Sequence, residues 1–307
     1  MKKIILFIFS LITVFTLASC KVKTQEVNII CPSGTPLLSI VNYMDEHKEA
    51  KVEVAQGSDP LVAAFAKDYY DVIVAPVNLG AKFYNANGNY VLAKTIVWGN
   101  LYIASKNDIN SFDDLNGKKL VVFGKNSTPD IIVKAILASK TNINVEIEYV
   151  SDVAEANALL VSGKAEYIVT AEPSISKIKD AKGLKTLDLQ EEYSKISGTK
   201  SYPQAGIFVL KSKKNDRLIK SVISSLIESV DYTNKEPGLT ANKAVELNDT
   251  FKTIGAEALT KAIPNCHFNV LSKKEEKEAV NKYLQLMIDL GFSKQVGDKL
   301  PDEEFFL

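Results

Sequence analysis

A buried-strand pattern runs through Asp71-Val72-Ile73-Val74-Ala75 and leads directly into the loop Pro76-Val77-Asn78-Leu79-Gly80. Continuous apolar runs of this length are typical of strands that are covered on both faces. Upstream, residues 26–47 and 51–67 show the same order of strand, small polar loop and helical spacing. Strands that alternate with helices predict a parallel sheet with helices on its faces. We therefore expect an α/β fold.

The rest of the chain divides into a second alternating block and a mostly helical end. Residues 91–105 are strand-like but are interrupted by Trp98-Gly99-Asn100, and the second block, which includes a helix expected from Pro173, follows. The late helices have apolar faces that need a sheet to cover. We predict two lobes, each a mainly parallel sheet flanked by helices, with two hinge crossings near residues 105 and 203. Lobe 1 comprises residues 20–105 plus 206–307, and lobe 2, residues 106–205, is inserted.

The N-terminus has the pattern of a targeting signal. Lys2-Lys3 precede an apolar run, and Leu17-Ala18-Ser19-Cys20 has the form of a lipobox. An apolar run of about 14 residues is short for a spanning helix and suits a signal peptide. We predict a lipoprotein signal peptide over residues 1–19 and a lipid on Cys20, whose two acyl chains hold the protein on the membrane. The alternative is an anchor helix that is retained.

Composition limits the partners and the chemistry of a site. Lys plus Arg and Asp plus Glu number 37 each, so the net charge is zero and no nucleic-acid partner is expected. Arg217 is the only arginine, and it lies on a helix expected to face solvent. Carboxylates and phosphates are often held by the bidentate guanidinium group. A site in this chain must instead use backbone amides, hydroxyls, side-chain amides or lysines.

Several motifs occur in an order that resembles one transport family. They are the lipobox, Ser33-Gly34-Thr35-Pro36, Asp71–Pro76, Asp113-Asp114-Leu115-Asn116-Gly117-Lys118-Lys119-Leu120, Ala171-Glu172-Pro173 and the tail Lys299–Phe306. Together they resemble the substrate-binding lipoproteins of ABC importers, in the nitrate, sulfonate and thiamine-precursor group. The resemblance covers nearly the whole mature chain. It implies a two-lobed type II periplasmic-binding-protein fold that captures a small organic molecule by hinge closure.

The same resemblance implies partners and a location. The ligand would be delivered to the permease and ATPase subunits of an ABC importer. The protein would be a lipid-anchored monomer on the outer face of the bacterial cytoplasmic membrane, with no enzyme activity, cofactor or metal.

Ligands of open α/β sheets bind beyond the carboxyl ends of the strands, and each such end here carries small polar residues. Backbone N–H groups at the helix starts can hold an anionic or carbonyl-bearing group with the help of the helix dipole. The alternative for each loop is ordinary helix capping. The loop candidates for ligand binding are Ser33, Gly34, Thr35, Gly57, Ser58, Pro76, Asn78, Lys125, Asn126, Ser127, Thr128, Thr170 and Glu172.

Residues near the two crossings extend the candidate site. Trp98 and Tyr202 can stack on a flat ligand at the mouth of the cleft, and Trp98 can equally pack between the lobes or in the core. Glu172 can accept a hydrogen bond from a ligand amine, or can favour the start of the helix expected at Pro173. The remaining candidates are Asn100, Gln204 and Tyr84.

The cysteines and histidines leave other functions open. Cys31 ends the first expected strand and can be the nucleophile of a cleft enzyme, but His47 lies at the far end of the next helix and His267 directly follows Cys266. A metal-binding lipoprotein is a second alternative, although the two histidines and scattered carboxylates show no recognisable ligand spacing. A surface adhesin or scaffold is a third. Cys31 and Cys266 either form a disulfide or remain as small buried thiols.

The ligand class also stays open at this point. A flat heterocycle such as a vitamin precursor would use the aromatic rings, and a small sulfonate would use the helix-start amides. An amino acid is less favoured because no arginine is placed to take its carboxylate.

Overall fold

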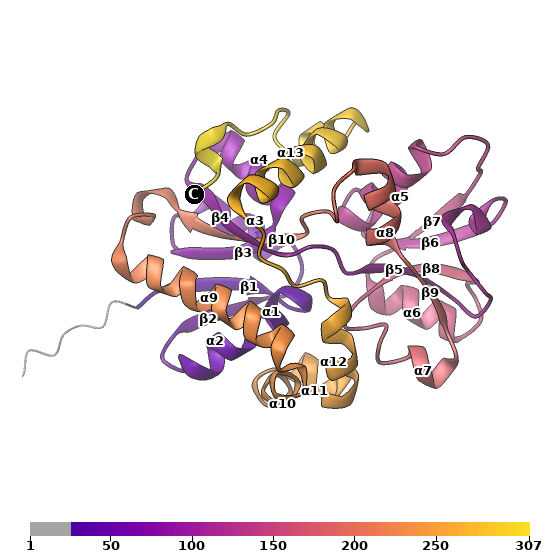
Figure 1. The fold of residues 1–307 in the computed structure, drawn as a ribbon, viewed down its shortest axis with the longest axis horizontal. Helices are drawn as coiled ribbons and strands as arrows, with labels where there is room; N and C mark the ends of the chain where they lie inside the picture. Colours follow the sequence, from indigo (N-terminus) through magenta and orange to yellow (C-terminus); the bar gives the residue numbers. More distant parts are fainter. Residues whose placement is uncertain (1–25) are drawn as a thin grey trace, which may run out of the picture.

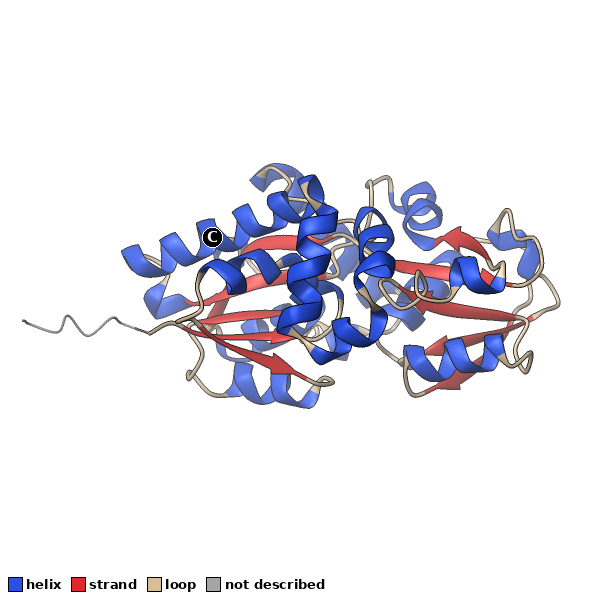
Figure 2. Cartoon of the chain, turned by 90° about the horizontal axis from the view of Figure 1, so that it is seen from below, coloured by secondary structure: helices blue, strands red, loops and turns tan. Residues whose placement is uncertain are grey.

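The computed structural model describes residues 26–307, so the expected signal peptide, residues 1–19, and the expected lipid site, Cys20, lie outside the described residues. The described chain forms two lobes joined at their facing ends (Figure 1). Each lobe contains a five-stranded sheet with helices packed on it (Figure 2). Every helix within residues 26–307 falls short of the length and apolarity that a bilayer crossing requires.

The opening motif lies in the middle of the first sheet. This sheet has the order β2-β1-β3-β10-β4, and the residues Val72 to Ala75 of β3 are fully buried. β1 runs parallel to β2 and β3, whereas β10 runs antiparallel to β3 and β4. The strand bounds are β1 Asn28–Pro32, β2 Lys51–Ala55, β3 Val72–Pro76, β4 Tyr90–Val97 and β10 Ala205–Leu210.

The second sheet repeats this plan with the order β7-β6-β8-β5-β9. β6 runs parallel to β7 and β8, and β5 runs antiparallel to β8 and β9. Each sheet therefore has a single reversed strand, and that strand is the one entered directly from a crossing. The strand bounds are β5 Leu101–Ser105, β6 Lys119–Phe123, β7 Glu146–Val150, β8 Tyr167–Ala171 and β9 Lys185–Asp188.

The first crossing lies earlier than the sequence suggested. β5 pairs with strands of the second sheet, so the chain crosses at Trp98-Gly99-Asn100 and not near residue 105. β4 and β5 are both largely buried, and the interruption at Trp98-Gly99-Asn100 marks the change of sheet between them. The second crossing, residues 198–204, runs beside the first: Gln204 N donates to Val97 O at 2.9 Å, and Ser201 Oγ donates to Trp98 O.

Helices cover both faces of each sheet (Figures 1 and 2). In the first lobe, α1, α2 and α9–α12 share one apolar cluster, and α3, α4 and α13 belong to another on the opposite face. In the second lobe, α5 and α8 pack on one face and α6 on the other. The α-helix bounds are α1 Thr35–Ser39, α2 Val41–Glu46, α3 Asp59–Ala66, α4 Val77–Asn87, α5 Thr128–Ala138, α6 Val153–Val161, α7 Lys179–Lys182, α8 Leu189–Ser197, α9 Arg217–Lys235, α10 Pro237–Leu247, α11 Asp249–Ile254, α12 Ala256–Ala262 and α13 Lys273–Asp289. Short 3₁₀ turns are η1 Phe112–Leu115, η2 Lys211–Lys213, η3 Ile263–Asn265, η4 Ser293–Gln295 and η5 Glu303–Phe305.

One apolar cluster continues from the first lobe into the second. Tyr283 of α13 packs on Tyr202 with ring centroids 6.3 Å apart, and Tyr202 meets Tyr193 of α8 at 5.4 Å. Buried aromatic contacts of this kind stabilise beyond their area burial. The lobes are therefore joined by packed side chains on the α13 side as well as by the chain crossings.

The helix expected from Pro173 does not form. Residues 172–178 are turns, and α7 begins only at Lys179. Ile175 N bonds to Ala171 O and Ile178 N bonds to Ile175 O, which closes separate turns in place of a continuous helical ladder. The end of β8 is thus followed by an irregular segment that lies against the first lobe.

Candidate functional site

The start of α1 in the first lobe meets the end of β8 in the second. Thr35 Oγ1 donates to Glu172 O at 2.7 Å, and Asn100 Nδ2 donates to Thr35 Oγ1 at 2.8 Å and to Glu172 O at 3.2 Å. Glu172 N donates back to Asn100 O at 3.0 Å. All three residues are buried, with exposed fractions of 2% to 5%. Three predicted ligand residues therefore meet where both lobes and the first crossing come together, and we call this group the Thr35–Asn100–Glu172 junction.

The carboxyl group of Glu172 has a raised pKa. Burial raises the pKa of Glu172 to about 7, and it outweighs the opposing hydrogen bonds from Ser176 and the charges of Lys179 and His267. Ser176 Oγ donates to Glu172 Oε1 at 2.9 Å. Since no helix starts at Pro173, the expected role of Glu172 at that helix start is wrong. Near neutral pH this carboxyl group can act as either a hydrogen-bond donor or an acceptor.

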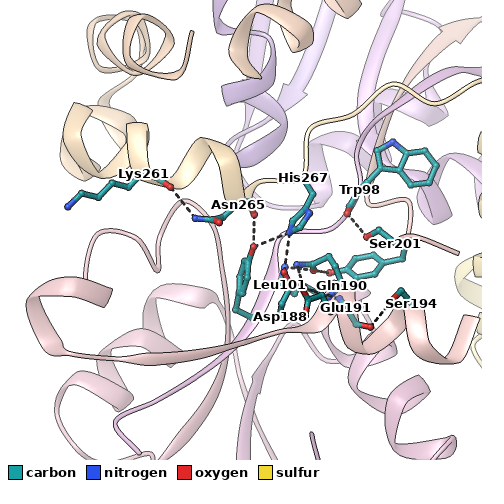
Figure 3. A network of polar contacts seen from close by, with 12 residues as sticks. Trp98, Leu101, Asp188, Gln190, Glu191, Ser194, Ser201, Lys261, Asn265 and His267 are labelled. Atoms are coloured by element: carbon teal, nitrogen blue, oxygen red, sulfur yellow. Dashed lines mark hydrogen bonds and ion pairs between the residues drawn. The ribbon is translucent and has the colours of Figure 1, made fainter. Parts of the chain in front are cut away.

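A second polar contact joins the lobes through His267 (Figure 3). Tyr102 on β5 donates its hydroxyl to Asn265 O at 2.8 Å and lies 3.1 Å from His267 Nε2. The same nitrogen lies 3.4 Å from Asp188 Oδ2 at the end of β9. Asn265 and His267 belong to the segment between α12 and α13, so these contacts form only while the lobes are together.

Gln190 organises the interior of the crossings (Figure 3). Its Oε1 accepts from Leu101 N at 2.9 Å and from the Tyr202 hydroxyl at 2.6 Å. Tyr202 is fully buried between Tyr193 and Tyr283. The expectation that its ring stacks on a ligand is therefore wrong in this structure, because no face of the ring is open.

Trp98 borders a cavity of about 440 Å³ beside the crossings. Its Nε1 donates to Asn269 O at 3.1 Å, and only 4% of the residue is exposed. Trp98 is thus packed against the α12–α13 segment, and it is the only predicted ligand residue on this cavity wall. The other lining residues are Gly198, Thr199, Lys200, Ser201, Pro264, His267, Phe268, Asn269, Leu271, Glu275, Glu278 and Ala279.

Two helix starts of the first lobe, those of α3 and α4, keep their backbone donors free of side-chain caps. α3 begins after Ser58 and α4 after Pro76, and neither residue makes a side-chain capping bond. At α4, Val77 N donates to Gln204 O at 3.2 Å, which ties this start to the second crossing. Uncapped first-turn N–H groups attract hydrogen-bond acceptors.

The start of α5 in the second lobe also lacks a side-chain cap, but an acidic residue, Asp130, lies in its first turn. The fully buried Asp130 carboxylate accepts from Asn126 N at 2.8 Å, from Tyr149 Oη at 2.8 Å and from Lys134 Nζ at 3.0 Å. A carboxylate in the first helical turn already complements the helix dipole. Asp130 therefore orders the loop before α5, while Ser127 at the start of the helix makes no side-chain cap.

The remaining loop candidates fall into three groups. In the first group, Gly57, Ser58, Lys125, Asn126 and Ser127 are exposed. The second group serves packing: Thr170 Oγ1 donates to Asn157 Oδ1 at 2.7 Å inside the second lobe, and Thr128 accepts from the Tyr283 hydroxyl at 3.5 Å.

Four further candidates, Ser33, Gly34, Pro76 and Asn78, are half-buried beside β1 and β3. Ser33 N donates to Ala55 O at 3.0 Å, and Gly34 holds a positive φ of 92° at the start of α1. Tyr84 donates its hydroxyl to Asp302 and packs on Phe305, so it contacts the C-terminal tail in place of the interlobe region.

Cys31 and Cys266 are free, buried thiols, so the disulfide alternative is wrong and the thiol interpretation is confirmed. Burial raises the pKa of both thiols well above their usual range. A thiol held in its protonated form is a poor nucleophile. Over residues 26–307, no group of three or more His, Cys, Asp or Glu side chains is arranged to hold a metal ion.

Several residues with these contacts were not anticipated as site residues: Tyr102, Asn265, His267 and Asp188 between the lobes, and Gln190 at the crossings. None of them lies in a strand-end loop rich in small polar residues. The adjacency of His267 to Cys266 drew attention only to catalysis, whereas its positive φ of 52° places it in a tight bend facing β5. The available signal was His267 itself, an isolated histidine between two helices.

We next compared the chain with known proteins. No protein-family model and no curated protein sequence matches the chain. Among solved structures, an ABC transporter protein from Parabacteroides distasonis has a TM-score of 0.76 and 23% identity, over 92% of this chain and 98% of that one. The aliphatic sulphonate binding protein SsuA from Escherichia coli has a TM-score of 0.68 and 14% identity, over 91% of each chain. A Candida albicans gene product described as having the generic periplasmic binding protein fold has a TM-score of 0.57 and 11% identity, over 91% of this chain and 99% of that one.

The chain has the periplasmic binding protein fold. The two-lobed α/β architecture expected from the sequence is confirmed. In the periplasmic binding protein fold seen here, both crossings enter the antiparallel strand of the sheet that they reach. The Thr35–Asn100–Glu172 junction then lies between the facing strand ends of the two lobes.

Proposed function

We propose that this protein is an extracytoplasmic solute-binding component of an ABC importer, which traps a small organic molecule between its lobes. The carrying observation is the Thr35–Asn100–Glu172 junction, a buried polar contact between the facing strand ends of two lobes joined by two crossings. The fold supports this assignment. Similar solved structures include an alkanesulfonate-binding protein from Xanthomonas axonopodis and a ligand-binding component of an ABC-type import system from Staphylococcus aureus.

The ligand would sit against the strand ends on either side of the junction. From the first lobe, the uncapped starts of α3 and α4 offer backbone N–H donors. The second lobe would contribute the end of β8 and the loop before α5. The side chains we propose for ligand contact are Ser33, Ser58, Asn78, Asn100, Lys125, Ser127, Glu172 and Gln204.

Capture would work by hinge closure about the two crossings. Thr35 contacts Glu172 and Tyr102 contacts Asn265 only when the lobes meet, so these bonds belong to the closed form. A ligand shifts the equilibrium toward closure to the extent that it makes contacts with both lobes that the open form lacks. The closed form would then dock on the permease, which releases the ligand for transport driven by the ATPase.

The location follows from the N-terminal pattern. Removal of residues 1–19 and lipidation of Cys20 would hold the protein on the outer face of the membrane, with lobe 1 and lobe 2 free in the extracytoplasmic space. We propose a monomer, because both sheets and the apolar cluster that the lobes share are completed within one chain.

The test uses residues 20–307, purified natively, unfolded to remove carried ligand, and refolded. Small-angle scattering would be recorded with and without a small-molecule extract of the host cells, and bound compounds would be identified by mass spectrometry. We expect compaction and a higher unfolding temperature, since a ligand at 100 times its dissociation constant adds about 2.7 kcal/mol to stability. An unchanged radius of gyration and unchanged unfolding temperature with every fraction of the extract would contradict the proposal.

A further inference from the structure

The cavity that Trp98 borders, which we call the Trp98 cavity, lies apart from the proposed solute site. Its walls come from the two crossings, from residues 264–271 and from the first two turns of α13. None of the side chains proposed above for ligand contact lies on these walls. The volume of about 440 Å³ falls within the range of roughly 300 to 1,000 Å³ that is usual for small-molecule sites.

Apolar atoms form the larger part of the cavity wall. Phe268 and Ala279 are buried, Leu271 is half-buried, and Trp98 is almost fully enclosed by the protein. Trp98 Nε1 already donates to Asn269 O at 3.1 Å, so the indole ring offers the cavity an apolar surface in place of a free donor. An occupant would therefore bind mainly by removing apolar surface from water and by contact with aromatic rings.

The charged residues on the wall are of both signs and are already engaged. Glu275 forms a capping box with Ser272, and hydrogen bonds from Ser272, followed by the charge of Lys200, lower the pKa of Glu275. Glu278 Oε1 lies 2.9 Å from Lys282 Nζ. An anion in the cavity would meet the two carboxylates, whereas a cation would meet Lys200 and Lys282.

His267 does not change this balance. Its Nε2 lies 3.4 Å from Asp188 Oδ2 and 3.1 Å from the Tyr102 hydroxyl, so a positive charge on the ring is opposed by Asp188. Burial of an ion is costly unless an opposite charge is free to pair with it. The wall of the Trp98 cavity therefore favours an uncharged occupant.

We propose that the Trp98 cavity is a second binding site, which takes an uncharged, mostly apolar organic molecule with a flat ring. The ring would lie against Trp98 and Phe268. Asn269 Oδ1 accepts from Val270 N at 2.8 Å, which leaves the Nδ2 group at the wall to donate to a hydroxyl or carbonyl oxygen of the ligand. This site goes beyond the proposed function, because a solute at the facing strand ends contacts other residues.

The test uses residues 20–307 without lipid or detergent, and the uncharged probe N-phenyl-1-naphthylamine, whose fluorescence rises in apolar sites. Trp98 is the only tryptophan of the chain, so energy transfer from it reports probe bound to the protein. Three competitors share one naphthalene ring: 1-naphthalenemethanol is uncharged, 1-naphthoate is an anion and 1-naphthylmethylammonium is a cation at neutral pH. We expect the alcohol to displace the probe about tenfold better than either ion. Absence of energy transfer, or an ion that competes as well as the alcohol, would overturn the ligand class.

Two matched variants locate the bound probe. Ala279→Leu enlarges a buried side chain on the wall of the Trp98 cavity. Ala135→Leu makes the same change at another cavity of about 440 Å³, which lies between α5, α8 and α13. We expect Ala279→Leu to weaken probe binding by about tenfold, because the added methyl groups occupy the space of the ring, and Ala135→Leu to leave it unchanged. Equal losses, or a loss in Ala135→Leu alone, would contradict binding in the Trp98 cavity.

A third variant does not require extra room beside a buried helix face. Leu271→Asn makes a half-buried part of the wall polar, and it should weaken probe binding by about three- to tenfold. Leu247→Asn at the exposed end of α10 is its control. Unfolding temperatures verify that each variant is folded, and an unchanged affinity in folded Leu271→Asn would refute the site. Compaction with the cell extract tests the solute site separately, because none of these substitutions alters a residue proposed for it.

Discussion

Glu172 combines a buried carboxyl group with a position between two moving parts. Its carboxyl accepts from Ser176 within the second lobe, whereas its backbone carbonyl accepts from Thr35 in the first lobe and from Asn100. The backbone therefore makes the interlobe contact while the side chain carries the titratable proton. This division lets the protonation state change without removing the contact that aligns the lobes.

Stability should consequently depend on pH through Glu172. Its pKa rises from 4.5 to about 7 on folding, so the unfolded chain loses the proton first as the pH increases. The contribution of this group is fully present below pH 4.5 and is lost as the pH rises through 7, by about 3 kcal/mol in total. Glu172→Gln removes this titration. Urea unfolding at pH 4.5 and pH 8 should show wild type losing stability relative to the variant at the higher pH.

A control for this experiment is Glu275→Gln. Glu275 forms a capping box with Ser272, and those hydrogen bonds lower its pKa. Its carboxylate favours folding at higher pH, so the difference between wild type and this variant should change in the opposite direction. Parallel pH profiles for the two variants would refute the assignment to Glu172.

At the residue scale, the sequence identified the three polar residues of the junction, but the expected ligand contact of Tyr202 at the second crossing was wrong. Thr35, Asn100 and Glu172 were expected because they follow or join strand ends, which topology brings together. Tyr202 was expected at the cleft mouth for the same reason, but it is enclosed by Tyr193 and Tyr283. Those rings come from α8 and α13, and nothing local to Tyr202 in the sequence shows that both helices converge on it.

At the scale of elements, the first crossing depends on one glycine. Gly99 has a φ of 89°, and a side chain there would collide with Gln190. The absence of a side chain lets Gln190 Oε1 reach Leu101 N and the Tyr202 hydroxyl together. The crossing is therefore shaped by a close approach between α8 and the backbone that links the two sheets.

Gly99→Ala should destabilise the protein by about 2–4 kcal/mol, because it strains the backbone and displaces a buried glutamine from two hydrogen bonds. Gly88→Ala is the matched control, since Gly88 has a φ of 68° at the end of α4 and its added carbon would meet only Tyr84 O at 3.9 Å. The control should lose only about 1 kcal/mol from backbone strain. Denaturant unfolding measures both. Equal losses would show that the Gln190 contact contributes nothing.

Some strands and helices could be predicted from the sequence alone. β3 was identified from its continuous apolar run, and α9 and α13 from their helical periodicity, because each signal is local. The change of sheet between β4 and β5 was placed too late, since both strands are largely buried and Trp98-Gly99-Asn100 was interpreted as an interruption within one strand-like stretch. Which sheet a buried strand joins is decided by its hydrogen-bonded neighbours, and these are distant in sequence.

At the scale of the whole molecule, closure depends on polar contacts on one side and on packing on the other. The Thr35–Asn100–Glu172 junction and the Tyr102–His267 contact join the lobes through hydrogen bonds. On the α13 side, Tyr283 and Tyr202 extend one apolar core across both lobes. Hydrogen bonds can be exchanged for water on opening, whereas a packed core resists separation. We therefore expect the lobes to open on the polar side, with the aromatic side acting as the pivot.

The closing equilibrium can be tested with Tyr102→Phe, which removes the hydroxyl that donates to Asn265 O across the lobes. The loss of one such bond, about 1 kcal/mol, should shift the closed-to-open ratio by about fivefold and weaken ligand binding by a similar factor. Tyr90→Phe is the matched control, because its hydroxyl donates to Tyr70 O within the first lobe.

Small-angle scattering of the unliganded proteins should show a larger radius of gyration for Tyr102→Phe alone. Trp98, which packs beside the crossings, gives an independent fluorescence readout of the same opening. Identical scattering and fluorescence in wild type and both variants would show that the Tyr102 contact does not hold the lobes together.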